Sequence, residues 1–375
     1  MAKKELVLVI GPTPPPHHGV AVAIQTLLDS RVKEAFEIRH LDLADRRGIE
    51  YVNAPDLHDV FLFIKQWLGF IQILIRDRCK IVYVPISQKT VGFIRDSFFV
   101  WPAILVGSRV VIHLHGGGLR TWYETRGRVL KFYVRRLFSG VAHVIVLGNS
   151  FRSIFDGLVP AEKISVIPNG IRWNDNDAAS IGTVGKRRRY RILHLGTLSQ
   201  AKGTLVLLAA AAILVKIRRD IEFVFAGEWS RPQEKEQAQS FITQEGFADA
   251  VLFTGSVAGQ AKSALFRSAD LFVFAGVQQE GQPLVVIEAM AAGLPILFTD
   301  RGCLRETVIG GENGLEVRCN DPEHLAKQIL LLLESPESLK RMGVRSRARY
   351  EALYTEERYA EKMVALFLKV AKENT

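Results

Sequence analysis

The stretch from Ala269 to Thr299, ADLFVFAGVQQEGQPLVVIEAMAAGLPILFT, places two short apolar runs on either side of a longer segment. The runs Ala269–Phe274 and Pro295–Thr299 are too short for helices, and each predicts a buried strand. The segment 284–292 between them is long enough for a helix. A strand, a helix and a second strand in this order are typical of a parallel sheet, because parallel neighbours need a crossover.

The same alternation runs along the rest of the chain and predicts two such sheets. The other expected strands are Leu6–Gly11, Phe36–Leu41, Lys80–Val84, Arg109–His115, Val141–Gly148, Ile164–Ile167, Arg191–Gly196, Ile221–Gly227, Val251–Gly255 and Leu315–Val317. The other expected helices are 19–31, 57–76, 93–106, 122–138, 149–157, 203–217, 233–246, 260–267, 321–334, 336–349 and 356–373.

A polar stretch at 172–189, RWNDNDAASIGTVGKRRR, interrupts the alternation and predicts a linker. We therefore expect an α/β protein with two doubly wound, Rossmann-like parallel-sheet domains at 1–171 and 190–355, and a last helix at 356–375. Ligands of such sheets bind beyond the carboxyl ends of the strands, so both domains are expected to face a cleft.

The net charge of the 375 residues is +10, which favours anionic partners such as a phosphorylated small molecule, an anionic membrane surface or nucleic acid. Three widely spaced cysteines, without a C-x-x-C pair, predict neither a disulfide framework nor a zinc cluster and fit the reducing cytoplasm. We find no secretory signal. The apolar stretch Val60–Ile75 is too short and too polar to span a bilayer, so we expect a buried or surface-docked amphipathic helix.

Glycine-rich turns follow several expected strands, where backbone N–H groups can face an anion. In the turn that starts at Gly11 and ends at Gly19, a phosphate contact and a plain tight turn are equally open. His115 precedes three glycines, and both a ligand-facing and a structural role are open. Lys202, in GTLSQAKG, is expected to contact a phosphate near a helix start. Ala201 stands where a P-loop requires glycine, which disfavours a Walker-type nucleotidase.

Two glutamates frame the loop and helix of the opening stretch. Glu280 lies in the loop, and Glu288 lies in the otherwise apolar helix 284–292. A carboxylate there is costly to bury without a polar partner. A ribose diol would suit it, and an ion pair with a neighbouring Arg or Lys is the alternative.

Glu280 and Glu288, separated by seven residues and followed by AMAAGLP, resemble the family-4 group of retaining GT-B glycosyltransferases. Further matching motifs are PPPHHG near the start, HG at 115–116, IPNG at 167–170, the Gly196–Gly203 turn, FAG at 225–227, TG at 254–255, and Glu306 before Asn313-Gly314. The resemblance implies a GT-B fold whose C-terminal helix returns to the N-terminal domain, and transfer of a sugar from a nucleotide-diphosphate sugar.

The resemblance also implies residue roles. Glu288 would hold the ribose hydroxyls, Lys202 would neutralise the diphosphate, and the N–H groups of Leu284 and Val285 would cap a phosphate. Glu280 and His115 would contact the transferred sugar, so that Glu280, His115 and Lys202 form the expected catalytic set. The other implied donor contacts are Gly19, Thr197, Val257, Gly281, Gln282 and Pro283.

The implied reaction retains the anomeric configuration, and the leaving phosphate accepts the proton of the acceptor. Neither a metal nor a separate cofactor is expected, and Asp175-Asn-Asp177 in the linker is not expected to bind metal. Thr197 departs from the pattern, because many relatives have Arg there, and His18 replaces a glycine. Arg172 stands where relatives commonly have Asp, with no clear consequence.

On the acceptor side, a glycan or a lipid-linked saccharide is expected. The segment 120–136 is basic and aromatic, and a helix there could contact an anionic membrane on the cytoplasmic face through Arg126, Arg128, Lys131 and Arg135. A helix with one buried face and one solvated face is the alternative.

The rival functions are a GT-B-fold sugar-nucleotide epimerase, a non-catalytic nucleotide-sugar-binding partner subunit, and a nucleic-acid-binding protein. The donor base, the sugar, the acceptor and the oligomeric state do not follow from the sequence.

Overall fold

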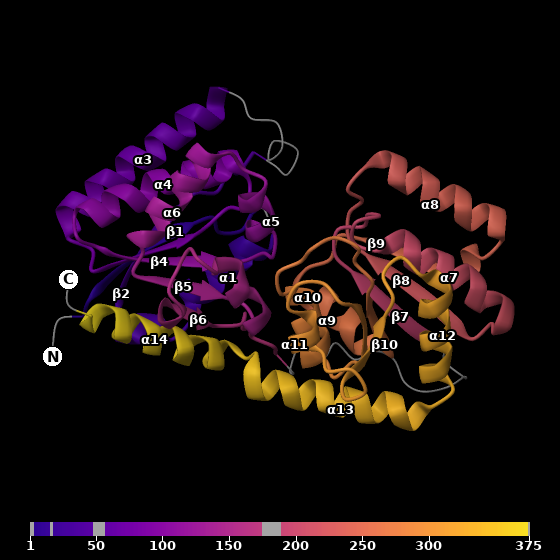
Figure 1. Cartoon of the computed structure of the whole chain (residues 1–375). Helices are drawn as coiled ribbons and strands as arrows, with labels where there is room; N and C mark the ends of the chain where they lie inside the picture. Colours follow the sequence, from indigo (N-terminus) through magenta and orange to yellow (C-terminus); the bar gives the residue numbers. More distant parts are fainter. Residues whose placement is uncertain (1–3, 16–17, 48–56, 175–188, 374–375) are drawn as a thin grey trace. The chain divides into compact units, whose positions relative to one another are not determined.

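The computed structural model describes residues 4–15, 18–47, 57–174 and 189–373. It divides into two compact units, the first Met1–Gly170 with Glu356–Thr375 and the second Ile171–Thr355 (Figure 1). The C-terminal helix therefore belongs to the first unit, as the resemblance implied. The linker expected at 172–189 lies mostly outside the described residues.

The first unit contains a six-stranded sheet in the order β2-β1-β3-β4-β5-β6, and every described pairing is parallel. Its strands are β1 Leu6–Gly11, β2 Glu37–Asp42, β3 Ile81–Pro85, β4 Arg109–Leu114, β5 His143–Val146 and β6 Ile164–Val166. Its helices are α1 Gly19–Asp29, α2 Val32–Ala35, α3 Leu57–Asp77, α4 Thr90–Leu105, α5 Leu119–Glu124, α6 Arg128–Ser139, η2 Asn149–Phe155, η3 Ala161–Lys163 and α14 Glu356–Lys372.

Helices cover both faces of this sheet, because alternate apolar side chains of each strand point to opposite sides. Val7 and Val9 of β1 face a core that contains α1 and α14. Phe367 of α14 meets Phe36 edge to face, with ring centroids 5.7 Å apart. This packing buries one side of α14 and holds the C-terminal helix in the first unit.

The second unit contains a parallel six-stranded sheet in the order β12-β11-β10-β7-β8-β9. Its strands are β7 Tyr190–Leu195, β8 Ile221–Ala226, β9 Val251–Gly255, β10 Leu271–Phe274, β11 Ile296–Thr299 and β12 Gly314–Val317. Its helices are α7 Thr204–Ile217, α8 Pro232–Glu245, η4 Ala248–Ala250, α9 Gly259–Ser268, α10 Leu284–Ala291, α11 Leu304–Thr307, α12 Pro322–Leu333 and α13 Pro336–Leu353.

Two apolar layers enclose this second sheet. Phe223 and Phe225 of β8 face the layer that contains α7, α8 and α12. Val224 and Ala226 of the same strand face the layer that contains α10 and the end of α13. The helix α7 is apolar around most of its surface, as expected for a helix buried between a sheet and its neighbours.

Two helix predictions in the first unit were wrong. The single helix expected at 122–138 is two helices, α5 and α6, because the chain leaves the helix at Thr125 and Gly127 takes an extended conformation before α6 begins. The helix expected at 149–157 is the shorter 3-10 helix η2. The short helices α2 and α11 were not expected.

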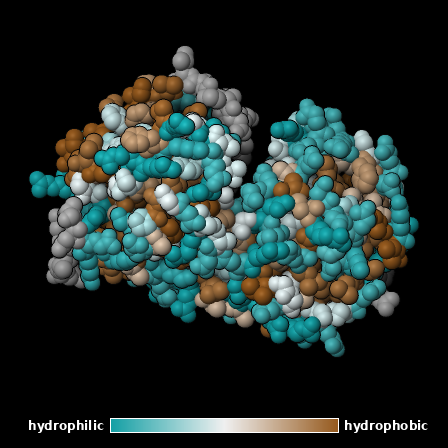
Figure 2. Space-filling model, in the orientation of Figure 1, coloured by the Kyte–Doolittle hydropathy of each residue, from teal (hydrophilic) through white to brown (hydrophobic). Residues whose placement is uncertain are grey.

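The prediction that no stretch could span a membrane also needs correction. Within α3, His58–Asp77 is one helix in the described part of the chain that is long and apolar enough to cross a membrane, judged by length and composition alone. Only 11% of its most apolar window is buried. Hydrophobic side chains accordingly gather on the surface over α3 and α4 (Figure 2).

Candidate functional site

The expected donor residues lie after two neighbouring strands of the second sheet. Lys202 follows β7, and Glu280 and Glu288 follow β10, which pairs with β7. From β7 the chain crosses to β8 on one side, while β10 lies on the other side. The strand order therefore reverses between these two strands, and parallel sheets bind ligands beyond the carboxyl ends of the strands at such a point.

A close backbone approach shapes the Lys202 turn. Gly203, which precedes α7, has φ 83°, and a Cβ there would lie 2.1 Å from the carbonyl oxygen of Ala275. Only glycine fits this position. Val277 in turn donates its N–H to the carbonyl of Ala201 at 3.0 Å. The turn with Lys202 and the loop after β10 are thus held side by side.

A buried hydrogen-bond chain supports the same turn from below. Nδ1 of His194 on β7 lies 3.1 Å from the carbonyl oxygen of Val273, so it must donate. Nε2 then accepts from the hydroxyl of Thr204 at 3.2 Å, and that oxygen accepts the N–H of Ser199 at 3.0 Å. Burial lowers the pKa of His194 to about 4, so the ring is neutral at neutral pH.

Lys202 and Glu280, both expected in the catalytic set, contact each other directly. The Lys202 ammonium lies 2.6 Å from Oε1 of Glu280, and both side chains are less than one-third exposed. If the Lys202 ammonium and the Glu280 carboxylate move apart, the ammonium can bind an anionic group of a ligand and the carboxylate can accept hydrogen bonds from its hydroxyl groups. The structure therefore places a side chain that can bind a phosphate next to one that can bind hydroxyl groups.

Glu288 has the ion-pair partner that its burial required. Its Oε1 lies 2.6 Å from the ammonium of Lys262 on α9, and its side chain is 19% exposed. Its other oxygen, Oε2, is buried and has no hydrogen-bond partner among the described residues. Burial raises the pKa of Glu288, while the charge and hydrogen bond of Lys262 oppose that shift.

The loop between the two glutamates is held by the segment after β11. A Cβ at Gly302, where φ is 64°, would lie 2.3 Å from the carbonyl oxygen of Glu280, so this close approach also requires glycine. The carbonyl of Gly281 accepts the N–H of Cys303 at 3.1 Å. Gln282 is buried, and its amide donates to Thr307 at 3.1 Å. The Gln282 side chain is thus already occupied in supporting α11.

The helix α10 begins directly after this loop, with Pro283 as its N-cap residue. Leu284 and Val285 are its first two residues, and N–H groups in the first turn of a helix have no acceptor within the helix. Val257 is partly buried between β9 and α9, and Thr197 is exposed directly after β7. The implied donor positions 197, 202, 257, 281–285 and 288 therefore all follow the carboxyl ends of β7, β9 and β10.

In the first unit, the expected residues follow β1 and β4. His18 stands where relatives often have glycine, but its φ of −136° is one that any residue can adopt. Its Nδ1 accepts a hydrogen bond from the N–H of Ala21 and so caps α1, which begins at Gly19. The His115 ring lies 3.9 Å from that of His113, and its Nε2 is buried without a partner among the described residues. Burial lowers the pKa of His115 to about 4, so the ring is neutral.

The structure adds three residues that the sequence analysis missed. Lys262 holds Glu288, and His194 supports the Lys202 turn. Gln88, after β3, accepts the N–H of Gly118 and occupies the space that a side chain at Gly116 would need. Lys262 and Gln88 lie in polar segments and His194 in an apolar strand, and no motif marks any of them.

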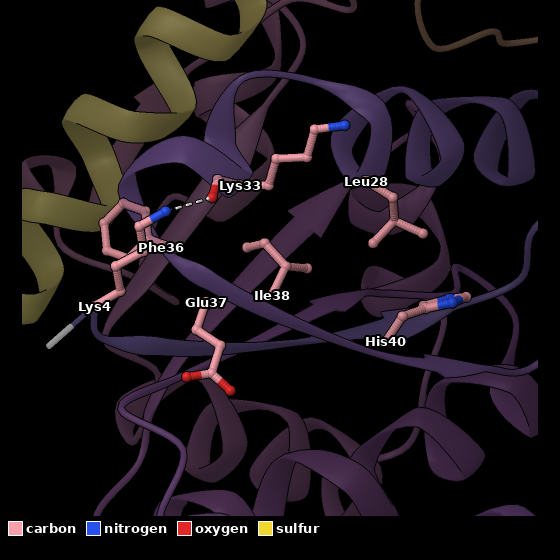
Figure 3. Close-up of a pocket in the computed structure, with 7 residues that line it drawn as sticks. All are labelled: Lys4, Leu28, Lys33, Phe36, Glu37, Ile38 and His40. Atoms are coloured by element: carbon pink, nitrogen blue, oxygen red, sulfur yellow. Dashed lines mark hydrogen bonds between the residues drawn. The ribbon is translucent and has the colours of Figure 1, made fainter.

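No group of three or more His, Cys, Asp or Glu side chains in the described ranges could hold a metal ion. The Asp175-Asn-Asp177 motif falls outside those ranges. An open pocket in the first unit is lined by Lys4, Leu28, Lys33, Phe36, Glu37, Ile38 and His40 (Figure 3). Its Lys4 ammonium already donates to the carbonyl of Lys33 at 3.0 Å, and none of the expected site residues lines it.

Residues 181–349 match the family model described as glycosyl transferases group 1. The chain is 31% identical over 204 residues to spore coat protein SA of Bacillus subtilis, which covers 53% of each chain. It is 29% identical to the phosphatidyl-myo-inositol mannosyltransferase of Mycobacterium leprae over 45% of this chain and 44% of that protein. The chain thus spans about half the length of the curated relatives it matches.

Solved structures match over nearly the whole chain. Sucrose-phosphate synthase of Thermosynechococcus elongatus has a TM-score of 0.76 at 18% identity, covering 98% of this chain and 99% of that one. The Anabaena HepE protein in complex with UDP has a TM-score of 0.72 at 16% identity, covering 97% and 100%. At these identities the two structures show the GT-B fold alone. The family model covers most of the second unit, and this part of the chain, residues 181–349, belongs to the group 1 glycosyl transferases.

Proposed function

We propose that the protein is a retaining glycosyltransferase that moves a hexose-type sugar from a nucleotide-diphosphate sugar to a glycan or lipid-linked saccharide. One observation carries the proposal: two Lys–Glu pairs lie beyond neighbouring strands at the switch point of the second sheet, and one carboxylate oxygen, Glu288 Oε2, has no hydrogen-bond partner in the part of the chain that the structure describes. Such a site offers separate contacts for a diphosphate and for a diol.

In this proposal the two pairs act differently. Lys262 keeps Oε1 of Glu288, and the unpartnered Oε2 accepts a hydrogen bond from a ribose hydroxyl. Lys202 turns from Glu280 to the diphosphate, whose charge it neutralises together with the first N–H groups of α10. Glu280 is then free to accept hydrogen bonds from hydroxyls of the transferred sugar.

The chemical step needs charge stabilisation more than a nucleophile. The bond between the sugar C1 and the diphosphate oxygen breaks, and the acceptor oxygen bonds to C1 on the same face. The acceptor proton passes to the departing phosphate oxygen, so the step is balanced without a metal or an enzyme base. Once Lys202 has turned to the bound diphosphate, its charge and the oriented amides of α10 stabilise the departing group, which is usually the largest contribution that such a site makes.

We infer the base of the donor nucleotide and the class of acceptor from the ligands and names of similar proteins. HepE was solved with UDP, which favours a UDP-sugar, with GDP as the second choice. One relative is named for a phosphatidylinositol acceptor, which favours a lipid-linked one. The three cysteines are free, which fits the reducing cytoplasm that we propose as the location.

The test is donor binding and turnover in the presence of EDTA. We expect a thermal shift with one UDP- or GDP-sugar, nucleotide release, and loss of both in Glu288→Ala and Lys202→Ala. Donor binding without release on any acceptor would favour the non-catalytic partner subunit. Formation of an isomeric nucleotide sugar would favour the epimerase.

A further inference from the structure

The exposed apolar side chains are concentrated on one layer of the first unit. Sixteen large hydrophobic side chains are exposed in the described ranges, and eleven of them belong to α3, to α4 with its C-cap residue Val106, and to α6. The other five are scattered over four helices and a strand. Single exposed hydrophobics are ordinary on protein surfaces, but a cluster of this kind marks an interaction site.

On α3 these side chains follow the helix period. Phe61, Ile64 and Leu68 are spaced i, i+3 and i+7, so they share one face, and they are 67%, 48% and 57% exposed. The opposite side of α3 is buried, since Phe70 and Leu74 are at most 3% exposed and Phe70 meets Phe99 of α4. The helix is therefore docked lengthwise on its own unit, and it could not cross a bilayer without exposing these core residues.

The three helices form one continuous layer. Phe63 of α3 packs edge to face on Phe98 of α4, and the Trp67 indole donates to the carbonyl of Phe98 at 3.0 Å. The Trp101 indole of α4 donates to the hydroxyl of Tyr133 on α6 at 3.2 Å. Figure 1 shows α3, α4 and α6 on one side of the first unit, and hydrophobic surface lies over α3 and α4 in Figure 2. Two tryptophans with satisfied N–H groups thus lie within an apolar layer.

The charge of this layer is positive. The three helices contain seven basic residues and three acids. Each acid forms an ion pair within the unit, Asp59 with Arg47, Asp77 with Arg39 and Asp96 with Arg95. On α6, Val129 and Phe132 are 86% and 70% exposed, and the exposed residues beside them include Arg128, Arg135 and Arg136. The helix has no acidic residue.

We infer that the layer formed by α3, α4 and α6 docks the protein on the surface of an anionic lipid bilayer. Apolar side chains enter the boundary of the acyl chains, while Lys65, Arg76 and the α6 arginines reach the headgroups. A second copy of the chain fits this layer poorly, because a two-fold contact would bring the two α6 arginine clusters together. The inference rests on the first unit alone and does not depend on the proposed sugar transfer.

This layer revises the membrane contact expected from the sequence. Arg126 lies between α5 and α6 and donates to Trp122 and Thr125 within its own unit, and Arg135 donates to the hydroxyl of Tyr123. Lys131 lies over the ring of Tyr123. Of the four expected contacts, Arg128 is exposed and its side chain forms no hydrogen bond or ion pair with another described residue, and the apolar residues of α3 supply most of the contact.

The test is flotation of the full chain with vesicles of phosphatidylglycerol and phosphatidylcholine, compared with phosphatidylcholine alone. The triple variant Phe61→Ser, Ile64→Ser, Leu68→Ser should bind the anionic vesicles at least about tenfold more weakly. Its matched control is Ile217→Ser, Leu331→Ser, Val344→Ser, which changes three side chains of similar exposure in the second unit and should bind like wild type.

A charge pair of variants completes the test. Arg128→Glu with Arg136→Glu should weaken binding by at least about twentyfold, since each surface charge contributes about fivefold in affinity. Lys340→Glu with Arg345→Glu, exposed on α13, should leave it unchanged. Equal binding of wild type and the α3 variant, or no binding of wild type to anionic vesicles, would overturn the inference. So would a wild-type dimer that the α3 variant converts to a monomer without any vesicle binding.

Discussion

The ammonium of Lys262 lies 2.6 Å from Oε1 of Glu288, while Oε2 of the same carboxylate is buried without a hydrogen-bond partner among the described residues. The lysine comes from α9 after β9, and the glutamate comes from α10 after β10. The pair therefore connects two helices and leaves one acceptor for a ligand. A carboxylate that is half satisfied in this way is prepared to accept a hydroxyl donor.

The contact between Lys262 and Glu288 should contribute to the stability of the second unit. Lys262→Met leaves a largely buried carboxylate without its cation, and we expect it to lower the free energy of unfolding by about 1–2 kcal/mol, since both side chains retain some exposure. The double variant Lys262→Met, Glu288→Gln should recover part of this loss, because it no longer buries an unpaired charge. A urea-unfolding double-mutant cycle measures the coupling, and additive effects would show that the contact contributes nothing.

Lys202→Ala should impair turnover far more than folding. Its partner Glu280 is 12% exposed, so loss of the cation should lower the free energy of unfolding by only about 1–2 kcal/mol, as in Lys262→Met. Loss of the cation beside the departing diphosphate should lower kcat by roughly a hundredfold or more. Lys340→Ala, an exposed lysine on α13, is the control. Unchanged kcat in Lys202→Ala would remove this residue from the reaction.

His194 should make the second unit sensitive to acid. Its pKa is lowered from 6.5 to about 4, so its contribution to stability is fully present above pH 6.5 and is lost as the pH falls towards 4. A shift of this size corresponds to about 3 kcal/mol. In His194→Gln, which keeps a donor and an acceptor, unfolding free energy should fall less between pH 7 and pH 4.

Burial also lowers the pKa of His113, His115 and His143, so the difference between wild type and His194→Gln is the informative quantity. Protonation also removes the acceptor for Thr204 and disturbs the Lys202 turn. Donor affinity of wild type should therefore fall below about pH 5 more steeply than that of the variant. Parallel pH profiles of the two proteins would contradict this role.

Gly203→Ala should distort the donor site, because the new side chain would clash sterically with a neighbouring backbone carbonyl. The new Cβ would lie 2.1 Å from the carbonyl of Ala275, and φ is positive as well. Gly246→Ala is the matched control, because φ is 69° there and no atom lies within 4 Å. Conformation alone costs about 1–2 kcal/mol in each variant. Gly203→Ala should lose clearly more stability in urea unfolding and most of its donor affinity; equal losses would show that the close approach is unimportant.

Strand and helix alternation predicted the fold because β-rich runs and helix-length segments follow one another from Leu6 to Val317. Its failures have local causes. The helix expected at 122–138 breaks at Gly127, where the extended backbone starts a new helix. The helix expected at 57–76 is α3, but its ability to span a bilayer was judged only on the apolar stretch Val60–Ile75 within it. Hydrophobicity alone also could not tell its buried face from its exposed one.

The sequence predicted that Glu288 needs a polar partner but not which one. Lys262 lies 26 positions away on another helix, and only packing brings it within 2.6 Å. His194 lies inside an apolar strand, and nothing in the sequence distinguishes it from the other residues of that strand. Its hydrogen-bond partners are brought near it only by the folding of the chain. The roles of Glu280, His115 and Lys202 remain predictions, although the structure brings Lys202 and Glu280 together.

The most direct test of sugar transfer is nucleotide release from a panel of UDP- and GDP-hexoses with EDTA present, with wild type beside Lys202→Ala and Glu288→Ala. We predict release from at least one donor by wild type, and none above background by either variant. Release that persists in both variants, or no release by wild type from any donor with glycan and lipid-linked acceptors present, would contradict the proposed function.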